Sequence, residues 1–346
     1  MKRKSLFIAT GEEMREATKT EARKKKLVKA FIDHLERFHS MSEIFDKDIE
    51  LEVLQDEIDA INNPKEVKFE KGIVTFSPSS ASKCERELFY KAKRFDKDEV
   101  QMLPFQKRWV RNGSAIHAAI QKDLLLAQEH LIKPEFKVLR LPNGKPAWER
   151  NIKDVKQFDY DGVRFQLFGM TDGILEFKDG TRILFEFKTK STSLGAIGEY
   201  KMKDAQDGHK QQALSYGLLF EEYGATETLF VYESLAKDGW NKGVEAKPDI
   251  RVFYYKPTQE EIEDLLEKFA RVAASVYANE IPEAEFPKSE KEYDEGFVCT
   301  FCPYKEQCEK DGGYSQTYVD EIKATKEARR EEAARKRAER ASRNLK

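Results

Sequence analysis

The chain has 346 residues, which is enough for a sizeable hydrophobic core and one or two domains. Charged residues make up 36% of it, but the net charge is only -2, so a nucleic-acid site would have to come from local patches. No apolar run approaches the ~18 residues of a membrane helix, and the short apolar run near the N-terminus does not fit a signal peptide. We therefore expect a soluble, cytoplasmic protein without a membrane partner. In a reducing compartment its four cysteines favour metal binding over disulfides.

Residues 1–71 are rich in charge and helical in pattern. Leu27, Phe31, Leu35 and Phe38 recur at spacings of three and four residues. This spacing is typical of an amphipathic helix that packs on the rest of the protein. The first segment is therefore expected to be a helical N-terminal extension.

The next elements are predicted from residue 72 onward. The stretch "GIVTFSPSS" indicates a short strand and a turn, and "SASKCERELFYKAKRF" indicates a helix capped by Ser79, Ser80 or Ser82. A second helix is expected in "NGSAIHAAIQKDLLLAQEHL". The segment that follows resembles a hairpin around Asn143 and Gly144.

A strongly charged hairpin, "GMTDGILEFKDGTRILFEFKTKS", is expected at 169–191, followed by a loop to about residue 208. A helix at 209–224, strands at 226–235 and 249–257, and a long helix at 258–280 complete the pattern. The sequence thus predicts an α/β core at 72–314. Residues 315–346 are predicted to form a solvated helix or a disordered basic tail.

The loop length of the charged hairpin decides which of its side chains meet. Glu186 and Lys188 share one face of their strand, because residues two apart point the same way. A two-residue turn would put Asp172 on the other face. A three-residue loop, 178–180, places Asp172 opposite Glu186, with Cβ atoms about 5 Å apart. We predict the three-residue loop.

Two carboxylates this close repel each other unless a cation lies between them. Oxygen ligands favour Mg²⁺ or Mn²⁺, and such an ion lowers the pKa of a bound water and neutralises charge on a phosphate. Lys188 beside them can orient or help to deprotonate that water. The alternative is a surface trio of Asp172, Glu186 and Lys188 joined by weak salt bridges.

Two further motifs can belong to the same site. His117, among small and apolar residues of a predicted helix, is either a packed core residue or a further metal ligand. Gln212 and Tyr216 are four residues apart and share a helix face. They form either an ordinary helix surface or a polar contact for a substrate backbone.

The cysteines form the sharper signal. Cys299, Cys302 and Cys308 cluster near the C-terminus, and Cys84 lies more than two hundred residues upstream. Their compact spacing favours a four-thiolate metal site, with two disulfides or four independent thiols as alternatives. Spacing alone does not separate zinc from an iron–sulfur cluster.

Taken together, these residues resemble the RecB-type branch of the PD-(D/E)XK nuclease superfamily, in its iron–sulfur subset. That subset includes the AddB nuclease domain and the exonucleases associated with CRISPR adaptation. The resemblance covers about residues 72–314. It depends on the order of "SPSSASKCERELFY", Gly113-x3-His117, "GMTDGI", "FEFKTKS", "QALSY" and the cysteine triplet.

The resemblance implies a mixed sheet flanked by helices and metal-dependent cleavage of DNA phosphodiesters. It implies that His117, Asp172 and Glu186 are metal ligands and that Lys188 is the catalytic lysine. Gln212 and Tyr216 match the family's Gln-x3-Tyr motif. The four cysteines, Cys84, Cys299, Cys302 and Cys308, match the ligands of a [4Fe–4S] cluster. Glu186 departs from many RecB-type members, which have Asp at this position.

The leading hypothesis is a Mg²⁺- or Mn²⁺-dependent DNA exonuclease acting in replication, recombination or repair. Its expected partners are single-stranded DNA or DNA ends and recombination or replication proteins, although no motif encodes the protein partners. A non-catalytic DNA-binding module with a structural zinc and a structure-specific or restriction-type endonuclease are the alternatives. The oligomeric state is not encoded in any motif.

Overall fold

The computed structural model describes residues 11–62, 64, 66–99, 102–190, 193–238, 248–286, 299 and 302–343. Its chain divides into two compact units. The first comprises the chain through Ser82 together with 102–160 and 164–267, and the second comprises 83–101, 161–163 and the chain from Lys268 onward. Each predicted catalytic side chain lies in the first unit and each cysteine in the second.

The first unit contains most of the secondary structure. Its helices are α1 (Gly11–His39), α2 (Lys47–Asn62), η1 (Pro78–Ser80), α4 (Pro104–His130), α5 (Glu149–Ile152), η2 (Leu194–Ala196), α6 (Asp207–Leu219) and η3 (Glu221–Tyr223). Its strands are β1 (Val74–Phe76), β2 (Phe136–Val138), β3 (Asp154–Tyr160), β4 (Val163–Gly169), β5 (Gly173–Phe177), β6 (Arg182–Lys190), β7 (Thr228–Ser234) and β8 (Ile250–Tyr255).

The strands form a five-stranded sheet of order β2-β5-β6-β7-β8 and a three-stranded sheet of order β1-β4-β3. In the larger sheet β6 and β7 run parallel, whereas β2–β5, β5–β6 and β7–β8 are antiparallel. The predicted mixed α/β architecture is confirmed. The charged strand β6 is the central strand of the larger sheet.

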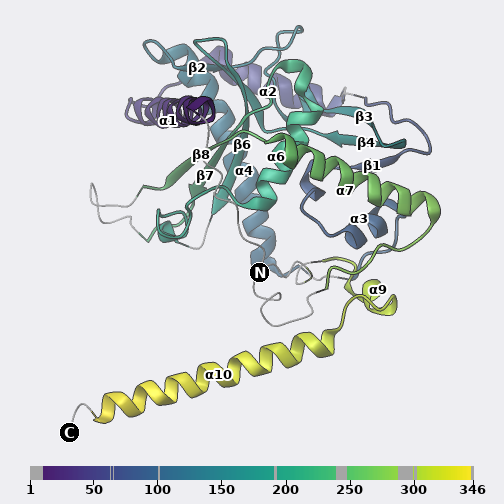
Figure 1. Cartoon of the computed structure of the whole chain (residues 1–346). Helices are drawn as coiled ribbons and strands as arrows, with labels where there is room; N and C mark the ends of the chain where they lie inside the picture. The colour runs from purple at the N-terminus through teal and green to yellow at the C-terminus, as the bar shows by residue number, and fades with distance from the viewer. Residues whose placement is uncertain are drawn as a thin grey trace. The chain divides into compact units, whose positions relative to one another are not determined.

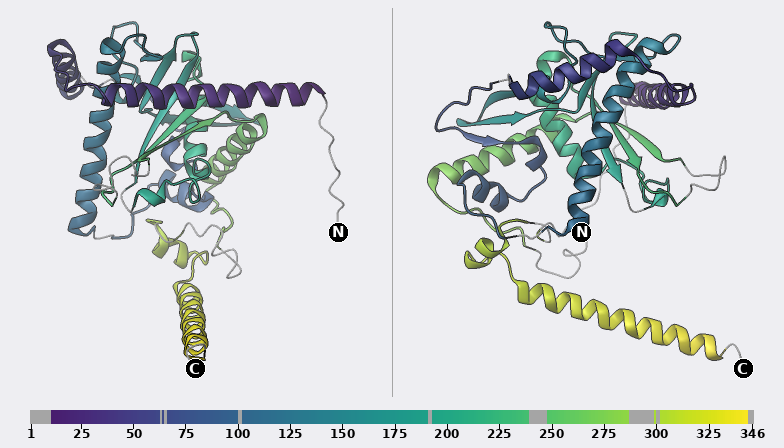
Figure 2. Two further views of the ribbon diagram at one scale, coloured as in Figure 1. Left: turned by 90° about the vertical axis from the view of Figure 1, so that its left-hand side faces the viewer. Right: turned by 180° about the vertical axis from the view of Figure 1, so that it is seen from behind.

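The two faces of β6 carry different side chains. Phe185 and Phe187 belong to a buried apolar cluster that includes Phe31 of α1 and Leu124 of α4. Phe31 stacks on Phe185 with ring centroids 5.8 Å apart. Helices α1 and α4 therefore cover this face of the sheet (Figures 1 and 2). The predicted amphipathic helix is confirmed, and it contributes directly to the core.

Helix α6 lies on the other side of β6. It contacts β6 of the larger sheet and β3 of the smaller one. Six of its thirteen residues are buried, including Tyr216, which is 8% exposed. Because α6 packs between the two sheets, a polar side chain on α6 that points toward β6 has a well-defined position. Helix α6 ends at Leu219, and the following turn closes at Gly224, which has a φ of 71°.

One expectation about local structure needs correction. None of the three candidate serines caps α3 (Glu85–Ala92), because its N-cap is Cys84, whose thiol accepts a hydrogen bond from the amide of Glu87. The predicted hairpin around Asn143 and Gly144 is present as a short one, closed by the bridge between Arg140 and Pro146 and by backbone hydrogen bonds from Leu141 to Lys145 and from Ala147 to Leu139. Strand β2 ends before it and pairs with β5. The hairpin of β3 and β4 was not expected.

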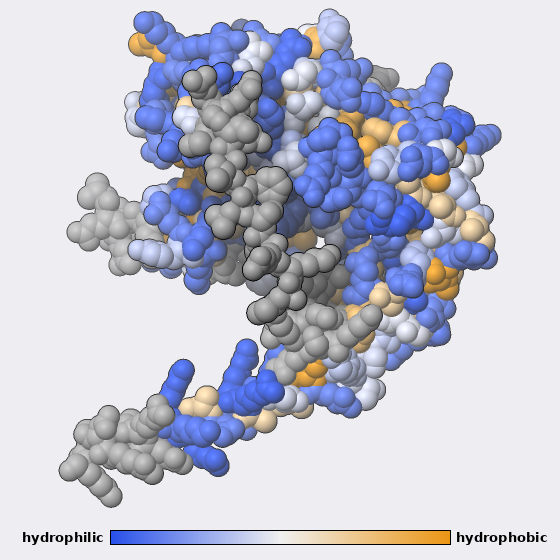
Figure 3. Space-filling model, in the orientation of Figure 1, coloured by the Kyte–Doolittle hydropathy of each residue, from blue (hydrophilic) through white to orange (hydrophobic). Residues whose placement is uncertain are grey.

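The second unit holds α3, α9 (Lys305–Lys310) and α10 (Gln316–Arg343), and α7 (Gln259–Ala278) continues into it from the first unit. Val319 and Ile322 in the first turns of α10 are buried. The described side chains beyond them are almost all exposed and mostly hydrophilic (Figure 3). The tail is therefore helical through Arg343 rather than disordered. None of the helices within the described ranges is long and apolar enough to cross a membrane.

Candidate active site

The register of the β5–β6 hairpin determines the geometry of the site. Gly173 pairs with Phe185 and Glu176 pairs with Arg182. The last backbone hydrogen bond of the hairpin joins Phe177 to Thr181, so the loop between them has three residues, 178–180. Gly180 in this loop has a φ of 80°. The predicted three-residue loop is confirmed. One residue beyond the last pair, Asp172 lies at the level of Glu186, and its Oδ2 accepts a hydrogen bond of 2.8 Å from the amide of Phe187.

Glu186 is the most buried charged residue of the site, at 1% exposure. Its Oε1 accepts a hydrogen bond from Lys188 Nζ at 2.5 Å, whereas its Oε2 is buried without a partner. Lys188 also donates to Oε1 of Gln212 at 3.3 Å, and Gln212 donates through Nε2 to the hydroxyl of Tyr216 at 3.2 Å. A continuous polar chain thus runs from β6 to α6.

Burial raises the pKa of Asp172, and the Lys188 ammonium offsets part of this rise. Burial also raises the pKa of Glu186, and the nearby Asp172 carboxylate raises it further. Two buried carboxylates with raised pKa values are the expected state of a cation site without its cation, because a bound divalent ion favours both charged forms.

His117 and Glu149 approach the same place from α4 and α5. His117 Nδ1 lies 3.8 Å from Asp172 Oδ1, and the imidazole meets Phe187 edge-on with ring centroids 5.2 Å apart. Burial lowers the pKa of His117, which favours the neutral imidazole that binds metals. One potential ligand atom from each of His117, Glu149 and Asp172 lies within 4.8 Å of the other two.

Glu149 is a site residue that sequence reasoning missed. It follows Trp148 in a segment with no recognisable motif, and only the fold brings it to the site. Its amide donates a 2.7 Å hydrogen bond to the carbonyl of Thr171, the residue before Asp172. This long-range contact leaves no pattern in the local sequence, so no sequence signal could have found it.

The fold brings together all six predicted catalytic and metal-site residues: His117, Asp172, Glu186, Lys188, Gln212 and Tyr216. The donor set of carboxylates and one imidazole fits a hard divalent ion such as Mg²⁺ or Mn²⁺. The unpartnered, buried Oε2 of Glu186 fits the same interpretation, since a buried charged oxygen without a partner is costly.

A cavity of about 730 Å³ opens beside these residues. Its walls come from three helices of the first unit, α2, α4 and α5, and His117 and Asp172 lie at its edge. Helix α2 contributes Asp56 and Glu57 to the wall, and α4 contributes Lys122. His117 and Asp172 are therefore accessible from a hollow that is large enough for a nucleotide, whereas Glu186 is buried and does not line it.

The cysteines form a separate cluster in the second unit. None of the four is in a disulfide. Burial raises the pKa of Cys84 to about 11 and those of Cys299 and Cys302 to about 12, and the thiols also raise one another's pKa values. Burial therefore disfavours the thiolate form of Cys84, Cys299 and Cys302, and a bound metal centre would stabilise it.

Positive and amide groups surround these sulfur atoms. Arg86 Nη1 lies 3.9 Å from Cys308 Sγ, and the amide of Glu87 lies 3.4 Å from Cys84 Sγ. A Cβ added at Gly313 would lie 2.9 Å from Cys308 Sγ and would also clash with Arg86. The backbone therefore approaches Cys308 as closely as only glycine permits.

A comparison with protein families agrees with this geometry. A family model described as "PD-(D/E)XK nuclease superfamily" matches residues 87–309. A solved structure titled "Crystal structure of SSO0001" is similar to this chain with a TM-score of 0.36 and 14% sequence identity, over 75% of this chain and 95% of that chain. A comparison with curated proteins finds no match. Because the family model spans more than half of the chain, this protein belongs to the PD-(D/E)XK nuclease superfamily.

Proposed function

We propose that this nuclease is a Mg²⁺- or Mn²⁺-dependent DNA exonuclease that acts on single strands or ends during replication, recombination or repair. The observation that carries the metal-dependent chemistry is the buried Glu186 carboxylate, which has one oxygen on Lys188 and the other buried without a partner. A buried, half-paired carboxylate destabilises the fold, and a bound cation would offset that cost.

The residues have distinct roles in this proposal. His117, Asp172 and Glu186 would hold the divalent ion, which when bound lowers the pKa of a water and neutralises phosphate charge. Lys188 Nζ lies 2.5 Å from Glu186 Oε1 and would stabilise charge that develops on the phosphate. Gln212 fixes the direction of the Lys188 side chain, and Tyr216 fixes Gln212.

The wall that α2 contributes to the cavity favours an exonuclease over an endonuclease. Val53, Asp56 and Ile61 of this helix face the cavity that leads to His117 and Asp172. A strand that ends in the cavity avoids this wall, whereas a strand that continues past the site has to pass it. Acidic groups in the wall also repel a continuing phosphate backbone.

We also propose that Cys84, Cys299, Cys302 and Cys308 bind a structural [4Fe–4S] cluster. The support is the grouping of all four thiols in one unit, the Arg86 and amide donors beside two of them, and the close approach at Gly313. Hydrogen bonds of this kind to cluster sulfurs are a general way in which proteins stabilise such centres.

The test compares a linear DNA labelled at one end with a covalently closed circle of the same sequence, each incubated with the anaerobically purified protein. We expect Mn²⁺-dependent release of labelled nucleotides from the linear DNA and an intact circle. Metal-dependent nicking of the circle at a comparable rate would contradict the exonuclease proposal and favour an endonuclease.

A further inference from the structure

Glu149, the first residue of α5, lies next to the catalytic hairpin but belongs to none of the sequence motifs described above. We propose that Glu149 is an additional carboxylate ligand of the divalent-metal site, and that the N-terminal helix α2 positions it through Asp56. This inference rests on the proposed metal-dependent function and adds to it a ligand and a positioning residue. Both residues lie in the first unit.

The first observation is the proximity of Glu149 to two predicted ligands. One carboxylate oxygen of Glu149 lies within 4.8 Å of ligand atoms of both His117 and Asp172. A further observation is the unpartnered Oε2 of Glu186, a residue that is only 1% exposed and that lies on β6 at the level of Asp172. Three potential ligand groups thus converge on one place, and a buried carboxylate oxygen without a partner lies on the adjoining strand.

The second observation is the backbone conformation of Glu149. Its φ is 36°, in the left-handed region that non-glycine residues seldom occupy. Such a conformation costs free energy and persists only when the surroundings enforce it. Here the amide of Glu149 is fixed at 2.7 Å by the carbonyl of Thr171, next to Asp172. The strained residue is therefore attached directly to the segment that carries a predicted ligand.

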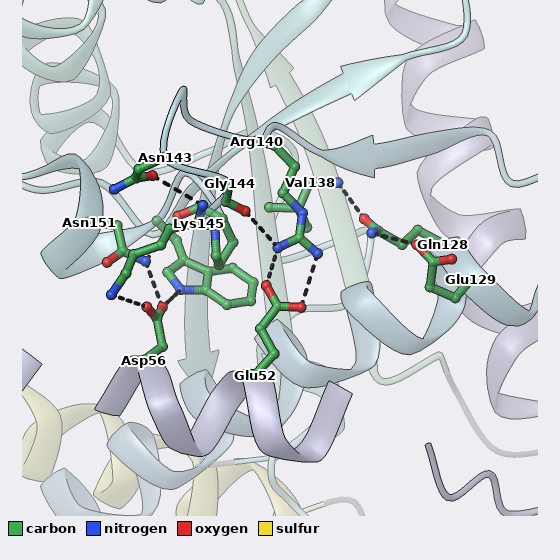
Figure 4. Close-up of polar contacts among 12 residues, drawn as sticks. Glu52, Asp56, Gln128, Glu129, Val138, Arg140, Asn143, Gly144, Lys145 and Asn151 are labelled. Carbon is green, nitrogen blue, oxygen red and sulfur yellow. Dashed lines mark hydrogen bonds and ion pairs between the residues drawn. The ribbon is translucent and has the colours of Figure 1, made fainter. Parts of the chain in front are cut away.

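The third observation is the set of contacts that α2 makes on both sides of Glu149. Asp56 Oδ2 accepts hydrogen bonds from Asn151 Nδ2 at 2.6 Å and from Trp148 Nε1 at 3.4 Å. These two donors are the residues one before and two after Glu149. Figure 4 shows Asp56 pointing from α2 toward this turn. Asp56 thus holds the turn without touching the metal ligands themselves.

Additional ion pairs fix α2 to the chain before the turn. Lys145 Nζ lies 3.0 Å from Asp56 and 2.8 Å from Asp59. Arg140 pairs with Glu52, as Figure 4 shows. Asp59 shares Lys145 with Asp56, but the described structure gives it no bond to Trp148 or Asn151. A substitution at Asp56 therefore removes the contacts that position Glu149, whereas a substitution at Asp59 only weakens the attachment of α2 through Lys145.

The experiment measures Mn²⁺ binding to the full chain without DNA, by electron paramagnetic resonance of the free ion. E149Q is compared with E57Q, because Glu57 lines the same cavity and its substitution removes the same charge. We expect E149Q to weaken Mn²⁺ affinity at least ~10-fold and E57Q to leave it unchanged. D56A is expected to weaken binding less than E149Q and to add nothing in an E149Q background, whereas D59A retains wild-type affinity.

Equal affinities of E149Q and E57Q would overturn the assignment of Glu149 as a ligand. Equal affinities of D56A and D59A would overturn the positioning role of α2. If E186Q abolishes Mn²⁺ binding while E149Q retains it, this inference fails and the proposed nuclease chemistry stands. If the folded wild type binds no Mn²⁺, both fail together.

Discussion

Lys188 donates a 2.5 Å hydrogen bond to Glu186 from a position two residues further along the same strand. Residues two apart share a strand face, so this pairing follows directly from the regular geometry of β6. On the neighbouring strand β7 the pair lies opposite Phe230 and Tyr232, and Glu186 retains one oxygen without a hydrogen-bond partner. The central strand of the sheet therefore carries an incomplete ion pair, which a divalent cation would complete.

The incomplete pairing predicts that a divalent ion stabilises the folded protein. Mn²⁺ at 100 times its Kd should raise the free energy of unfolding by about 2.7 kcal/mol, because the ion binds the folded site and not the unfolded chain. Calorimetric unfolding with and without Mn²⁺ measures the effect. E176Q serves as the control, since Glu176 lies on β5 in ion pairs with Lys137 and Arg182 and should respond to Mn²⁺ as the wild type does. An equal Mn²⁺ response in E186Q would contradict the assigned site.

Gly169 packs where a side chain has no room. A Cβ there would lie 2.8 Å from Pro78 Cδ and 3.3 Å from Tyr216 Cε1. We expect Gly169→Ala to destabilise the fold by about 1–3 kcal/mol and to shift Tyr216 away from Gln212. Gly113→Ala is the matched control in urea unfolding. Its Cβ would meet Thr189 Oγ1 at an ordinary 3.7 Å, and alanine within helix α4 should stabilise by roughly 0.5–1 kcal/mol. An unfolding midpoint in urea for Gly169→Ala equal to that of the wild type would contradict this packing.

His34 makes stability depend on pH. It is fully buried against Phe136, and burial lowers its pKa from 6.5 to about 4. The unfolded chain therefore binds the proton first as the pH falls. The contribution of His34 to the free energy of unfolding, roughly 3 kcal/mol, is fully present above about pH 6.5 and is lost as the pH falls to about 4.

Urea unfolding of wild type and His34→Gln between pH 4 and pH 7 isolates the contribution of His34. The wild type should lose more stability than the variant across this window. His130→Gln provides the control, because His130 is an exposed residue paired with Asp46 at 2.8 Å on the protein surface. Parallel pH profiles for wild type and His34→Gln would contradict the assignment.

The cysteine cluster predicts a definite metal content. Anaerobically purified protein should contain about four irons and four sulfides per chain, and Cys302→Ser should lose most of both. Lys188→Ala is a suitable control, because Lys188 lies in the other unit and its substitution should leave the iron content unchanged. One zinc per chain without sulfide would refute the iron–sulfur assignment and favour a structural zinc.

Much of the catalytic hairpin could be predicted because its information is local. Alternation along "ILFEFKTK" determines which side chains share a face, and the Lys178-Asp179-Gly180 loop determines the register. The amphipathic spacing of Phe31 and Leu35 likewise predicts their burial. In each case a short segment contains both the pattern and its consequence.

Other features depend on contacts between distant segments and could not be predicted. Glu149 reaches the site through a hydrogen bond to Thr171, and its neighbours are held by Asp56, more than ninety residues upstream. The N-cap of α3 is a cysteine because the chain has to place Cys84 among the other thiols, and local propensity would have chosen a serine. Residues whose position is determined by tertiary contacts therefore belong to the site without belonging to any of its sequence motifs.

The central claim is that Lys188 and the adjoining carboxylates catalyse metal-dependent cleavage of DNA. The most direct measurement is the degradation of end-labelled linear DNA by wild type and Lys188→Ala, each with and without Mn²⁺. We expect wild type to release the label only with Mn²⁺, and Lys188→Ala to be slower by at least ~100-fold while it remains folded and retains its iron. Equal Mn²⁺-dependent cleavage by both proteins, or no cleavage by the folded wild type, would contradict the account.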